Sequence, residues 1–318
     1  MRDKPLLAVP NVSEGRRKAT IDEIGRAFTA AETARLLDFH SDTDHHRSVF
    51  TLAGAQGQLS GALLAGARVA VERIDVGKDR ATAEIGVHPH VGAIDVVPLV
   101  YLDVSQRGAA CAEALVVAAE IGEGLDVPVF LYGELARGRT RAELRRGGVP
   151  GLAKRLSDGE LRPDFGPPQI HPTAGATLVA AREPLVAFNL ELAAPASTQD
   201  AKRIAALIRE GGPQGLPGLR AIGVSLSQSR EASQSPMPPA RAGGIGAAEA
   251  VAQLSMNVER PLELPLRVVV ERVRRHAEIA CAELVGLAPR AAFEGFPDDL
   301  AMPGFDPAAH MIENALGF

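Results

Sequence analysis

Short apolar runs alternate along the chain with longer segments in which apolar residues recur at helical spacing. The runs of the first part lie at residues 6–9, 36–39, 49–52 and 94–102, and they are typical of strands. Residues 58–74 place Leu59 and Leu63 on one face of a predicted helix, and another helix is expected from Ser13 to about residue 33. The predicted order is therefore β-α-β-β-α-β, and a helix at 109–125 and a strand at 127–131 follow it.

The second part of the chain repeats this order. A strand at 185–192 leads into a helix capped by Ser197 or Thr198, and the remaining elements are strands at 219–226, 252–258 and 283–287 with a helix at 265–280. We therefore predict an α/β fold of two split-βαβ (ferredoxin-like) α+β sandwiches, with a ligand cleft between the lobes. The lobes are expected to cover residues 1–180 and 181–318.

Two features interrupt this regular pattern. Pro98 lies inside the apolar run at 94–102, so that strand is expected at a sheet edge or at a bulge. Residues 227–249 form an insertion rich in Ser, Pro, Gly and Ala between the two middle strands of the second lobe. This composition predicts a flexible insertion that is disordered or acts as a late-ordering lid.

Composition excludes several classes of protein. The 318 residues are 46% hydrophobic and 23% charged, which is enough to bury a core. A net charge of −5 argues against nucleic acid as a partner. No apolar run reaches the roughly 18 residues of a membrane helix, and the N-terminus lacks the apolar core of a secretory signal. With only Cys111 and Cys281, and hence no disulfide framework, a cytoplasmic protein is expected.

Histidines give the first indication of chemistry. Six of the eight lie in the first 171 residues, namely His40, His45, His46, His88, His90 and His171. Pro89 restricts His88 to an extended backbone, and a neutral imidazole near pH 7 can take up a proton and return it to a leaving group. The alternative is a loop histidine that only caps or solvates the turn.

A metal site is a second interpretation of the same residues. In an extended segment His40, Asp42 and Asp44 share one face, as do His88 and His90, and imidazoles and carboxylates of this kind can ligate zinc. Neither an HExxH motif nor spaced cysteine pairs accompany them. The alternative is a polar turn whose Asp side chains bind their own backbone.

Two further segments carry polar groups at element ends. Asn11 and Ser13 follow the first strand, so their backbone amides could face an anionic group, although a plain helix cap is the commoner use. The Pro- and Gly-rich stretch at 162–177 includes Asp164, which could pair with an N–H-rich heterocycle. Its alternative interpretation is an interdomain linker.

Several ordered motifs resemble the glutamate formimidoyltransferase family. They lie at residues 9–15 (VPNVSEG), 88–96 (HPHVGAIDV), 128–134 (PVFLYGE), 163–167 (PDFGP), 175–177 (GAT), 187–189 (AFN), 253–257 (QLSMN) and 283–287 (ELVGL). The resemblance covers essentially the whole chain. It implies transfer of a formimino group from N-formimino-L-glutamate to N5 of tetrahydrofolate, as part of histidine breakdown and one-carbon metabolism.

The resemblance also implies roles for individual residues. The catalytic histidine of the family falls on His88, tetrahydrofolate is the co-substrate, and no metal and no fused cyclodeaminase domain are expected. The folate-contacting positions fall on Gly166, Pro167, Pro168, Gln169, Ile170, His171, Pro172, Thr173, Ala174 and Gly175, with Gly218 and Gly223 on a second folate-side stretch. Partners are small-molecule substrates rather than nucleic acid or membrane, and a homodimer is left open.

Other interpretations stay open at this stage. Arg47, Arg182 and Arg220 are available for substrate carboxylates. His90 stands where the family more usually has Arg, and His40 where some relatives carry an acidic residue, so the donor could be formyl rather than formimino. A metal-dependent hydrolase of N-formyl or N-formimino amino acids and a non-catalytic folate or amino-acid sensor are the alternatives.

Overall fold

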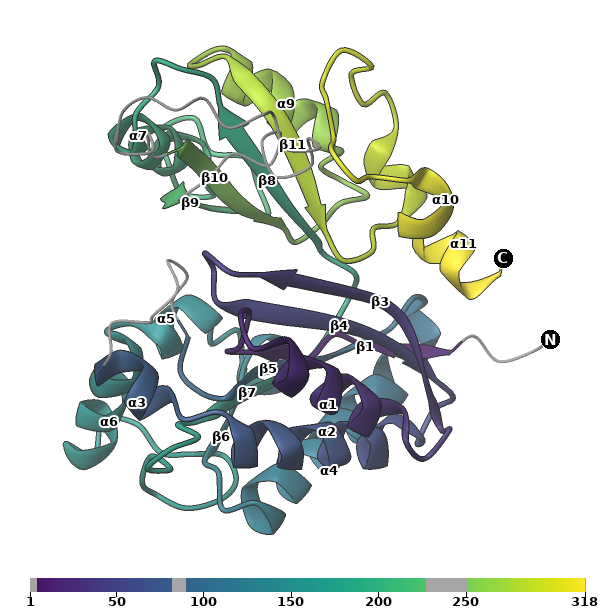
Figure 1. Ribbon diagram of the computed structural model, residues 1–318, viewed down its shortest axis with the longest axis vertical. Coiled ribbons are helices and arrows are strands. Elements are labelled where there is room, and N and C mark those ends of the chain that lie inside the picture. The colour runs from purple at the N-terminus through teal and green to yellow at the C-terminus, as the bar shows by residue number, and fades with distance from the viewer. Residues whose placement is uncertain (1–4, 82–89, 227–250, 318) are drawn as a thin grey trace, which may run out of the picture. The chain divides into compact units, whose positions relative to one another are not determined.

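The computed structural model describes residues 5–81, 90–226 and 251–317. The chain divides into two compact units, Met1–Glu183 and Pro184–Phe318 (Figure 1). The catalytic candidate His88 and the insertion predicted at 227–249 lie outside the described residues.

The first unit is built on one mixed sheet. Its strands are β1 (Leu6–Ala8), β2 (Asn11–Val12), β3 (Ala34–Asp42), β4 (Arg47–Gly54), β5 (Ile94–Val100), β6 (Val129–Leu131) and β7 (Thr177–Arg182). Across the sheet, β3 pairs with β4, and β1 and β2 both lie between β4 and β5, with all of these pairs antiparallel. This part is the predicted split-βαβ unit. The sheet then continues in parallel through β7 to β6.

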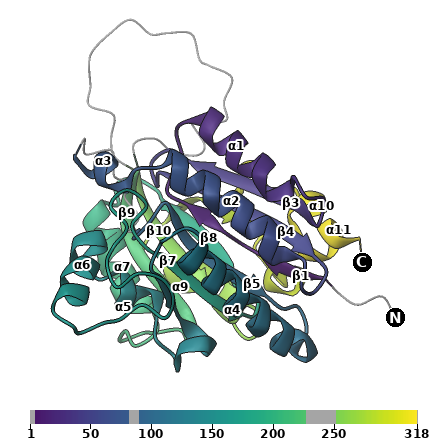
Figure 2. The same ribbon diagram turned by 90° about the horizontal axis from the view of Figure 1, so that it is seen from below.

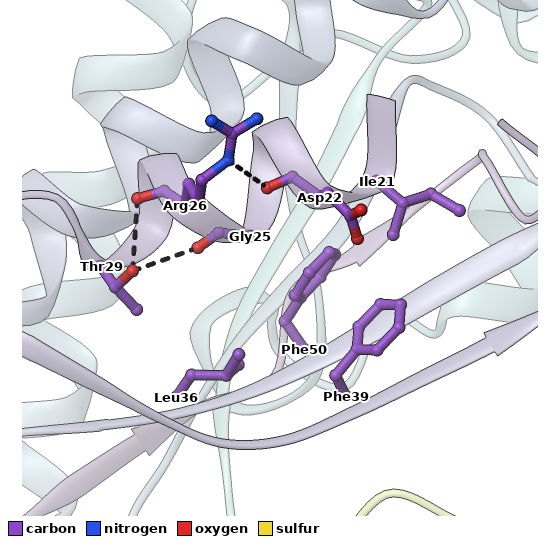
Figure 3. A pocket seen from close by; sticks show the side chains of 8 residues that line it. All are labelled: Ile21, Asp22, Gly25, Arg26, Thr29, Leu36, Phe39 and Phe50. Atoms are coloured by element: carbon purple, nitrogen blue, oxygen red, sulfur yellow. Dashed lines mark hydrogen bonds between the residues drawn. The ribbon is translucent and has the colours of Figure 1, made fainter. Parts of the chain in front are cut away.

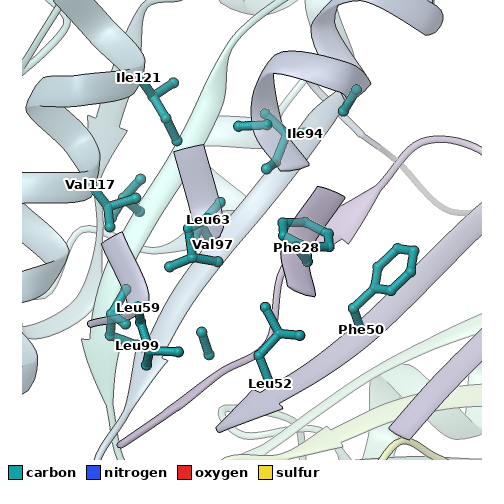
Figure 4. Packing of buried hydrophobic residues seen from close by; sticks show 14 of the residues in the cluster. Phe28, Phe50, Leu52, Leu59, Leu63, Ile94, Val97, Leu99, Val117 and Ile121 are labelled. Atoms are coloured by element: carbon teal, nitrogen blue, oxygen red, sulfur yellow. The ribbon is translucent and has the colours of Figure 1, made fainter. Parts of the chain in front are cut away.

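Helices cover both faces of this sheet. They are α1 (Lys18–Thr29), α2 (Leu59–Arg73), α3 (Val76–Ala81), α4 (Arg107–Gly124), α5 (Arg141–Arg145) and α6 (Gly148–Ser157), with short 3₁₀ turns at Val104–Gln106 and Gly133–Ala136. Helices α1, α2 and α4 lie side by side along one face (Figure 2). Phe28, Leu63 and Ile121 from these helices pack with strand residues such as Phe50 and Val97 to form the main core (Figure 4). Truncating a buried Phe in such a core costs about 3–5 kcal/mol.

The opposite face near β5, β6 and β7 has a smaller core of its own. Leu144 of α5 and Leu152 of α6 pack there against Phe130 and Leu178. Residues 137–175 therefore carry helices α5 and α6, and β7 follows them as a strand that the sequence pattern did not predict. The linker interpretation of residues 162–177 is wrong, because that stretch lies inside the first unit, which ends at Glu183.

Pro98 does not lie on an edge strand. Its strand β5 is central, with β1 and β2 on one side and β7 on the other. The missing amide of proline is tolerated because Pro98 lies level with the break between β1 and β2, where its carbonyl accepts the N–H of Val9 at 3.1 Å. The strand does have a bulge, but at Asp95 and not at Pro98, since Asn11 is opposite Val96 and Val12 is opposite Ile94.

The second unit has the predicted order in its described residues. It contains β8 (Val186–Leu192), α7 (Thr198–Ile208), β9 (Leu219–Leu226), β10 (Val251–Val258), α9 (Leu266–Arg274) and β11 (Ile279–Val285), followed by a 3₁₀ turn at Arg290–Phe293 and the short helices α10 (Pro307–His310) and α11 (Ile312–Leu316). The antiparallel sheet has the order β11-β8-β10-β9, which confirms the second split-βαβ unit. Its core lies between this sheet and helices α7 and α9.

None of the described helices combines the length and the apolarity that crossing a bilayer requires.

Candidate functional site

Two of the sequence motifs meet in the first unit. Ser13 lies just after β2, and its side-chain Oγ donates to the carbonyl of Gly92 at 2.7 Å while its backbone N–H donates to the carbonyl of Ala93 at 2.9 Å. Ser13 is therefore tied to the turn that follows His90. It does not cap a helix, because α1 begins five residues later at Lys18, with Arg17 as the N-cap residue. The expected helix start at Ser13 is wrong.

The GAT motif at residues 175–177 and the residue before it are hydrogen-bonded to the same turn. The N–H of Ala93 donates to the carbonyl of Ala174 at 2.8 Å, and the N–H of Ala176 donates to the carbonyl of Val91 at 2.9 Å. Gly92 and Gly175 form a bridge at this crossing. The turn at 90–93 thus lies directly beside the end of the predicted folate stretch.

The crossing requires glycine on both sides. A Cβ atom on Gly92 would lie 1.9 Å from the carbonyl oxygen of Ala176, and one on Gly175 would lie 2.2 Å from that of Val91. Gly175 also has a φ of +72°, in the left-handed region that favours glycine. The two backbones therefore touch without side chains between them, as glycines at a close backbone approach allow.

A buried ion pair supports the turn from the opposite side. Asp95 Oδ1 accepts the N–H of Val91 at 2.7 Å, and Asp95 Oδ2 pairs with the guanidinium of Arg145 on α5. Asp95 is 2% exposed and the Arg145 side chain 9% exposed. Removing one partner of such a pair costs about 3–5 kcal/mol, because the other charge stays buried without compensation. Sequence reasoning missed Arg145, although an Asp inside an apolar strand signals a buried partner.

The histidine-rich hairpin turn contacts the first motif. His46, in the turn between β3 and β4, is 5% exposed and its Nδ1 accepts the N–H of Gly15 at 3.2 Å. In a neutral ring this places the proton on Nε2. A Cβ on Gly15 would lie 2.0 Å from the carbonyl oxygen of Asp42, so this glycine allows the close contact. The histidine-rich segment at residues 40–47 and the VPNVSEG motif at residues 9–15 are therefore neighbours in space.

Glu14 holds the loop that leads into α1. Its Oε1 accepts the N–H groups of Arg16 and Arg17, each at 2.8 Å, and its Oε2 accepts from Arg17 Nε at 2.5 Å. Burial by itself would raise the pKa of Glu14, but these amide and guanidinium hydrogen bonds outweigh it and keep the pKa below its usual value. Because the amides of Ser13 and of residues 15–17 are bound within the protein, the anion-site interpretation is wrong for Ser13.

The polar-turn interpretation is confirmed for one aspartate of the histidine cluster. Asp42 Oδ1 accepts the N–H of His45 at 2.7 Å, as an Asp that starts a turn does. His40 and Asp42 both belong to β3, whereas Asp44 lies in the turn.

The predicted folate stretch is anchored at both ends. Gly166 has a φ of +80° and approaches the backbone of Gly122 on α4. At the other end, His171 Nδ1 accepts the N–H of Ala174 at 2.9 Å, so this imidazole caps its own turn. Pro168, Gln169 and Pro172 between these anchors are exposed.

Asp164 does not present both oxygens to a ligand. Its Oδ2 accepts the N–H of Leu131 at 2.7 Å and also pairs with Arg139. This carboxylate therefore joins the loop to the end of β6. Both bonds use Oδ2, and the interpretation that Asp164 recognises a heterocycle stays a prediction.

A polar face in the second unit was missed by sequence reasoning. Asn189 and Glu191 of β8 alternate with core residues, and Gln253 of β10 lies opposite Glu191. Asn189 Nδ2 donates to Glu283 Oε2 at 2.8 Å. Asn189, Glu191 and Gln253 are all buried. The alternation Phe188, Asn189, Leu190, Glu191 is the signal that could have identified this face.

Gly218 and Gly223 both have packing roles in the second unit. Gly218 has a φ of +76°, and its N–H donates to Glu210 Oε1 at 3.0 Å. A Cβ on Gly223 would lie 2.2 Å from the backbone nitrogen of Lys202, so this glycine lets β9 approach α7. Arg220, between them, pairs with Glu210 at 3.0 Å and with Glu259 at 3.2 Å.

An open pocket of about 520 Å³ lies between α1 and the β3–β4 hairpin (Figure 3). Its lining consists of Ile21, Asp22, Gly25, Arg26, Thr29, Leu36, Phe39 and Phe50. The rings of Phe39 and Phe50 lie 5.0 Å apart between centroids. This lining is largely apolar and includes no imidazole, so it is separate from the histidine motifs and does not offer their acid–base chemistry.

Comparison with known proteins identifies the family of this arrangement. The sequence-family model named formiminotransferase domain, N-terminal subdomain, matches residues 6–182. The chain is 33% identical to a glutamate formimidoyltransferase from Streptococcus pyogenes over 319 residues, which cover 97% of each protein. The chain belongs to the formiminotransferase family.

Other relatives extend the comparison within this family. A glutamate formimidoyltransferase from Thermoplasma acidophilum is 29% identical over 89% of the chain and 88% of its own length. A formimidoyltransferase-cyclodeaminase from Gallus gallus is 35% identical over 89% of the chain, which corresponds to 50% of that protein. The chain thus spans about half the length of this larger relative. The resemblance found in the sequence motifs is confirmed.

Proposed function

We propose that this formiminotransferase-family protein is a folate-dependent glutamate formimidoyltransferase. The observation that carries the proposal is the end-to-end similarity to a relative of that name, 33% identical over 97% of both chains. The donor is N-formimino-L-glutamate and the acceptor is tetrahydrofolate, a reaction of histidine degradation and one-carbon metabolism. A cytoplasmic location and small-molecule partners belong to the same proposal, which assigns no oligomeric state.

The reaction requires one bond to form and one to break. N5 of tetrahydrofolate attacks the formimino carbon and forms a C–N5 bond in a tetrahedral intermediate. The bond from this carbon to the glutamate nitrogen then breaks, and glutamate leaves as an amine. The N5 proton has to be removed and a proton has to reach the departing nitrogen, so one base that later acts as an acid serves both steps. Such proton transfer contributes typically ~10²–10⁴-fold in rate.

His88 is our candidate for this proton transfer. The family motif supports the assignment, as does the rigid turn that begins two residues later, where Val91, Gly92 and Ala93 are hydrogen-bonded to Ser13, Ala174 and Ala176. Holding two substrates in one geometry beside a fixed base supplies much of the remaining acceleration.

The folate contacts are proposed along the stretch that crosses this turn. They comprise Gly166, Pro167, Pro168, Gln169, Ile170, His171, Pro172, Thr173, Ala174 and Gly175, with Gly218 and Gly223 on the second unit. Gly218 and Gly223 have no side chains, so contacts from these two would use backbone groups. The Nδ1 of His171 caps its own turn, so a ring contact from this residue would use Nε2. Arg47 and Arg182 remain candidates for substrate carboxylates. Arg220 pairs with Glu210 and Glu259, so a substrate carboxylate there would have to compete with these two glutamates.

A coupled assay with formiminoglutamate and tetrahydrofolate tests the function. We expect turnover by the wild-type protein and a loss of about 10²–10⁴-fold in kcat for His88→Ala. Undiminished turnover by this variant would remove His88 from the mechanism. N-formylglutamate as donor tests the formyl alternative, release of glutamate without folate tests the hydrolase, and folate binding without turnover of any donor would indicate a sensor.

A further inference from the structure

Asp95 has a position that neither packing nor strand pairing accounts for. It is the bulge residue of the central strand β5, so no residue of β2 lies opposite to it. The bulge places it on the side of the sheet where α5 lies, among the apolar side chains of the smaller core. A carboxylate in such a place is costly unless both of its oxygens are bound.

The two oxygens of Asp95 have different partners. Oδ1 accepts the buried N–H of Val91, four residues earlier in the chain, and Oδ2 binds the guanidinium of Arg145, fifty residues later. Arg145 lies in the last turn of α5, whose first turn is fixed by a capping box of Thr140 and Glu143. The pair therefore connects the backbone at residue 91 to a helix that is itself capped.

The turn is held by three elements in all. Ser13 after β2 binds the carbonyls of Gly92 and Ala93, and the segment at 174–176 binds Val91 and Ala93 from another side. The N–H of Val91 takes no part in these contacts and donates instead to the Asp95 carboxylate. Without this acceptor the amide would be buried and unbound, which costs about 1–3 kcal/mol, and the turn would relax at its first residue.

We propose that Asp95, held by Arg145, is a positioning residue for the transfer reaction. It fixes the peptide at Val91, which directly follows His90 in the motif that also carries the catalytic candidate His88. The role of these histidines rests on the proposed function, whereas the anchoring of Val91 does not. Asp95 itself touches no reacting atom in this proposal.

The test compares two variants at one position with a matched control. Asp95→Ala removes the acceptor, whereas Asp95→Asn keeps an oxygen that can accept the Val91 N–H. Glu113→Ala is the control because Glu113 is also a buried carboxylate that accepts backbone N–H groups, those of Gly57, Leu59 and Ser60 at the start of α2. Glu113 lies outside the histidine motifs. Its replacement by Ala removes a carboxylate anchor of backbone amides, as Asp95→Ala does, but at the start of α2.

For each variant, kcat per folded molecule and KM for both substrates are measured. We expect Asp95→Ala to lower kcat at least about 30-fold with little change in KM. Asp95→Asn is expected to recover part of the loss, because its oxygen can still accept the Val91 N–H although its neutral amide no longer compensates the charge of Arg145. Glu113→Ala is expected to lower the melting temperature and to leave kcat within about twofold of wild type. Equal kcat for Asp95→Ala and wild type would overturn the proposal, as would equal losses for Asp95→Ala and Asp95→Asn.

An activity-independent measurement separates this proposal from the proposed function. Amide hydrogen exchange at Val91 is expected to accelerate at least tenfold in Asp95→Ala and to stay unchanged in Glu113→Ala. Unchanged exchange at Val91 in Asp95→Ala would refute the anchoring even if the enzyme has the proposed activity. If the wild-type protein transfers no formimino group while Val91 responds as expected, the proposed function fails and the anchoring stands.

Discussion

Gly92 and Gly175 face each other so closely that neither position has room for a side chain. We predict that Gly92→Ala forces the backbone of the turn away from Ala176, because its Cβ would lie 1.9 Å from that carbonyl oxygen. Overpacking of this kind costs about 1–3 kcal/mol. The thermal midpoint should fall, and turnover of formiminoglutamate should fall at least tenfold.

Gly108→Ala is the control for that substitution. Gly108 lies in the first turn of α4, and a Cβ there meets nothing within 4 Å. Alanine should keep or raise the thermal midpoint, by up to about 1 kcal/mol of stability, and should leave turnover unchanged. Wild-type behaviour of both glycine variants would contradict the close approach at Gly92.

Single residues with chemistry were easier to predict than their partners. The motifs led to His88 and to the glycines around it because each motif is local in sequence. Arg145 could not be paired with Asp95 in advance, since fifty residues separate them and only the packing of α5 on the sheet brings them together. The same holds for Ser13, whose hydroxyl binds Gly92 seventy-nine residues away instead of capping the nearest helix.

The start of α7 gives a pH-dependent test at the scale of an element. Ser197 and Asp200 form a capping box, and the hydrogen bonds from the Ser197 hydroxyl and amide, helped by Arg203, lower the pKa of Asp200 to about 2. Because the folded-state pKa lies below the ordinary value of 3.8, the stabilisation is present above about pH 4 and is lost as the pH falls toward 2.

The variant Asp200→Asn should therefore melt below wild type at pH 6. The difference between their thermal midpoints should shrink between pH 4 and pH 2.5, where the wild-type carboxylate loses its advantage. Ser197→Ala removes the main hydrogen-bond partner and should reduce the pH dependence of the wild-type protein in the same way. A difference that grows as the pH falls would contradict the assigned cap.

Elements with clear periodicity were predicted well, and those without it were not. β9 has the predicted bounds, and α2 begins and ends within one residue of its prediction. β7 was missed because it is parallel to its neighbours and largely buried on both faces, so its sequence shows no alternation of polar and apolar residues. Helices α5 and α6 were missed because Gly147, directly before α6, and Gly148 and Pro150, in its first turn, resemble loop sequence.

For the protein as a whole, the proposed chemistry requires proton transfer and positioning but no metal. We therefore predict that dialysis against a strong chelator leaves turnover unchanged. Asp42 Oδ1, one of the candidate ligand atoms, already accepts the backbone N–H of His45. Loss of turnover that added zinc restores would support the metal-dependent hydrolase instead.

The most direct measurement follows the formimino carbon itself. The protein is incubated with tetrahydrofolate and formiminoglutamate labelled with ¹³C in the formimino group, and the label is traced by NMR. We predict that the label moves to N5 of the folate as free glutamate appears, and that His88→Ala slows this transfer by at least about 10². Label released as formamide in the absence of folate, or label that stays on glutamate with the wild-type protein, would contradict the account.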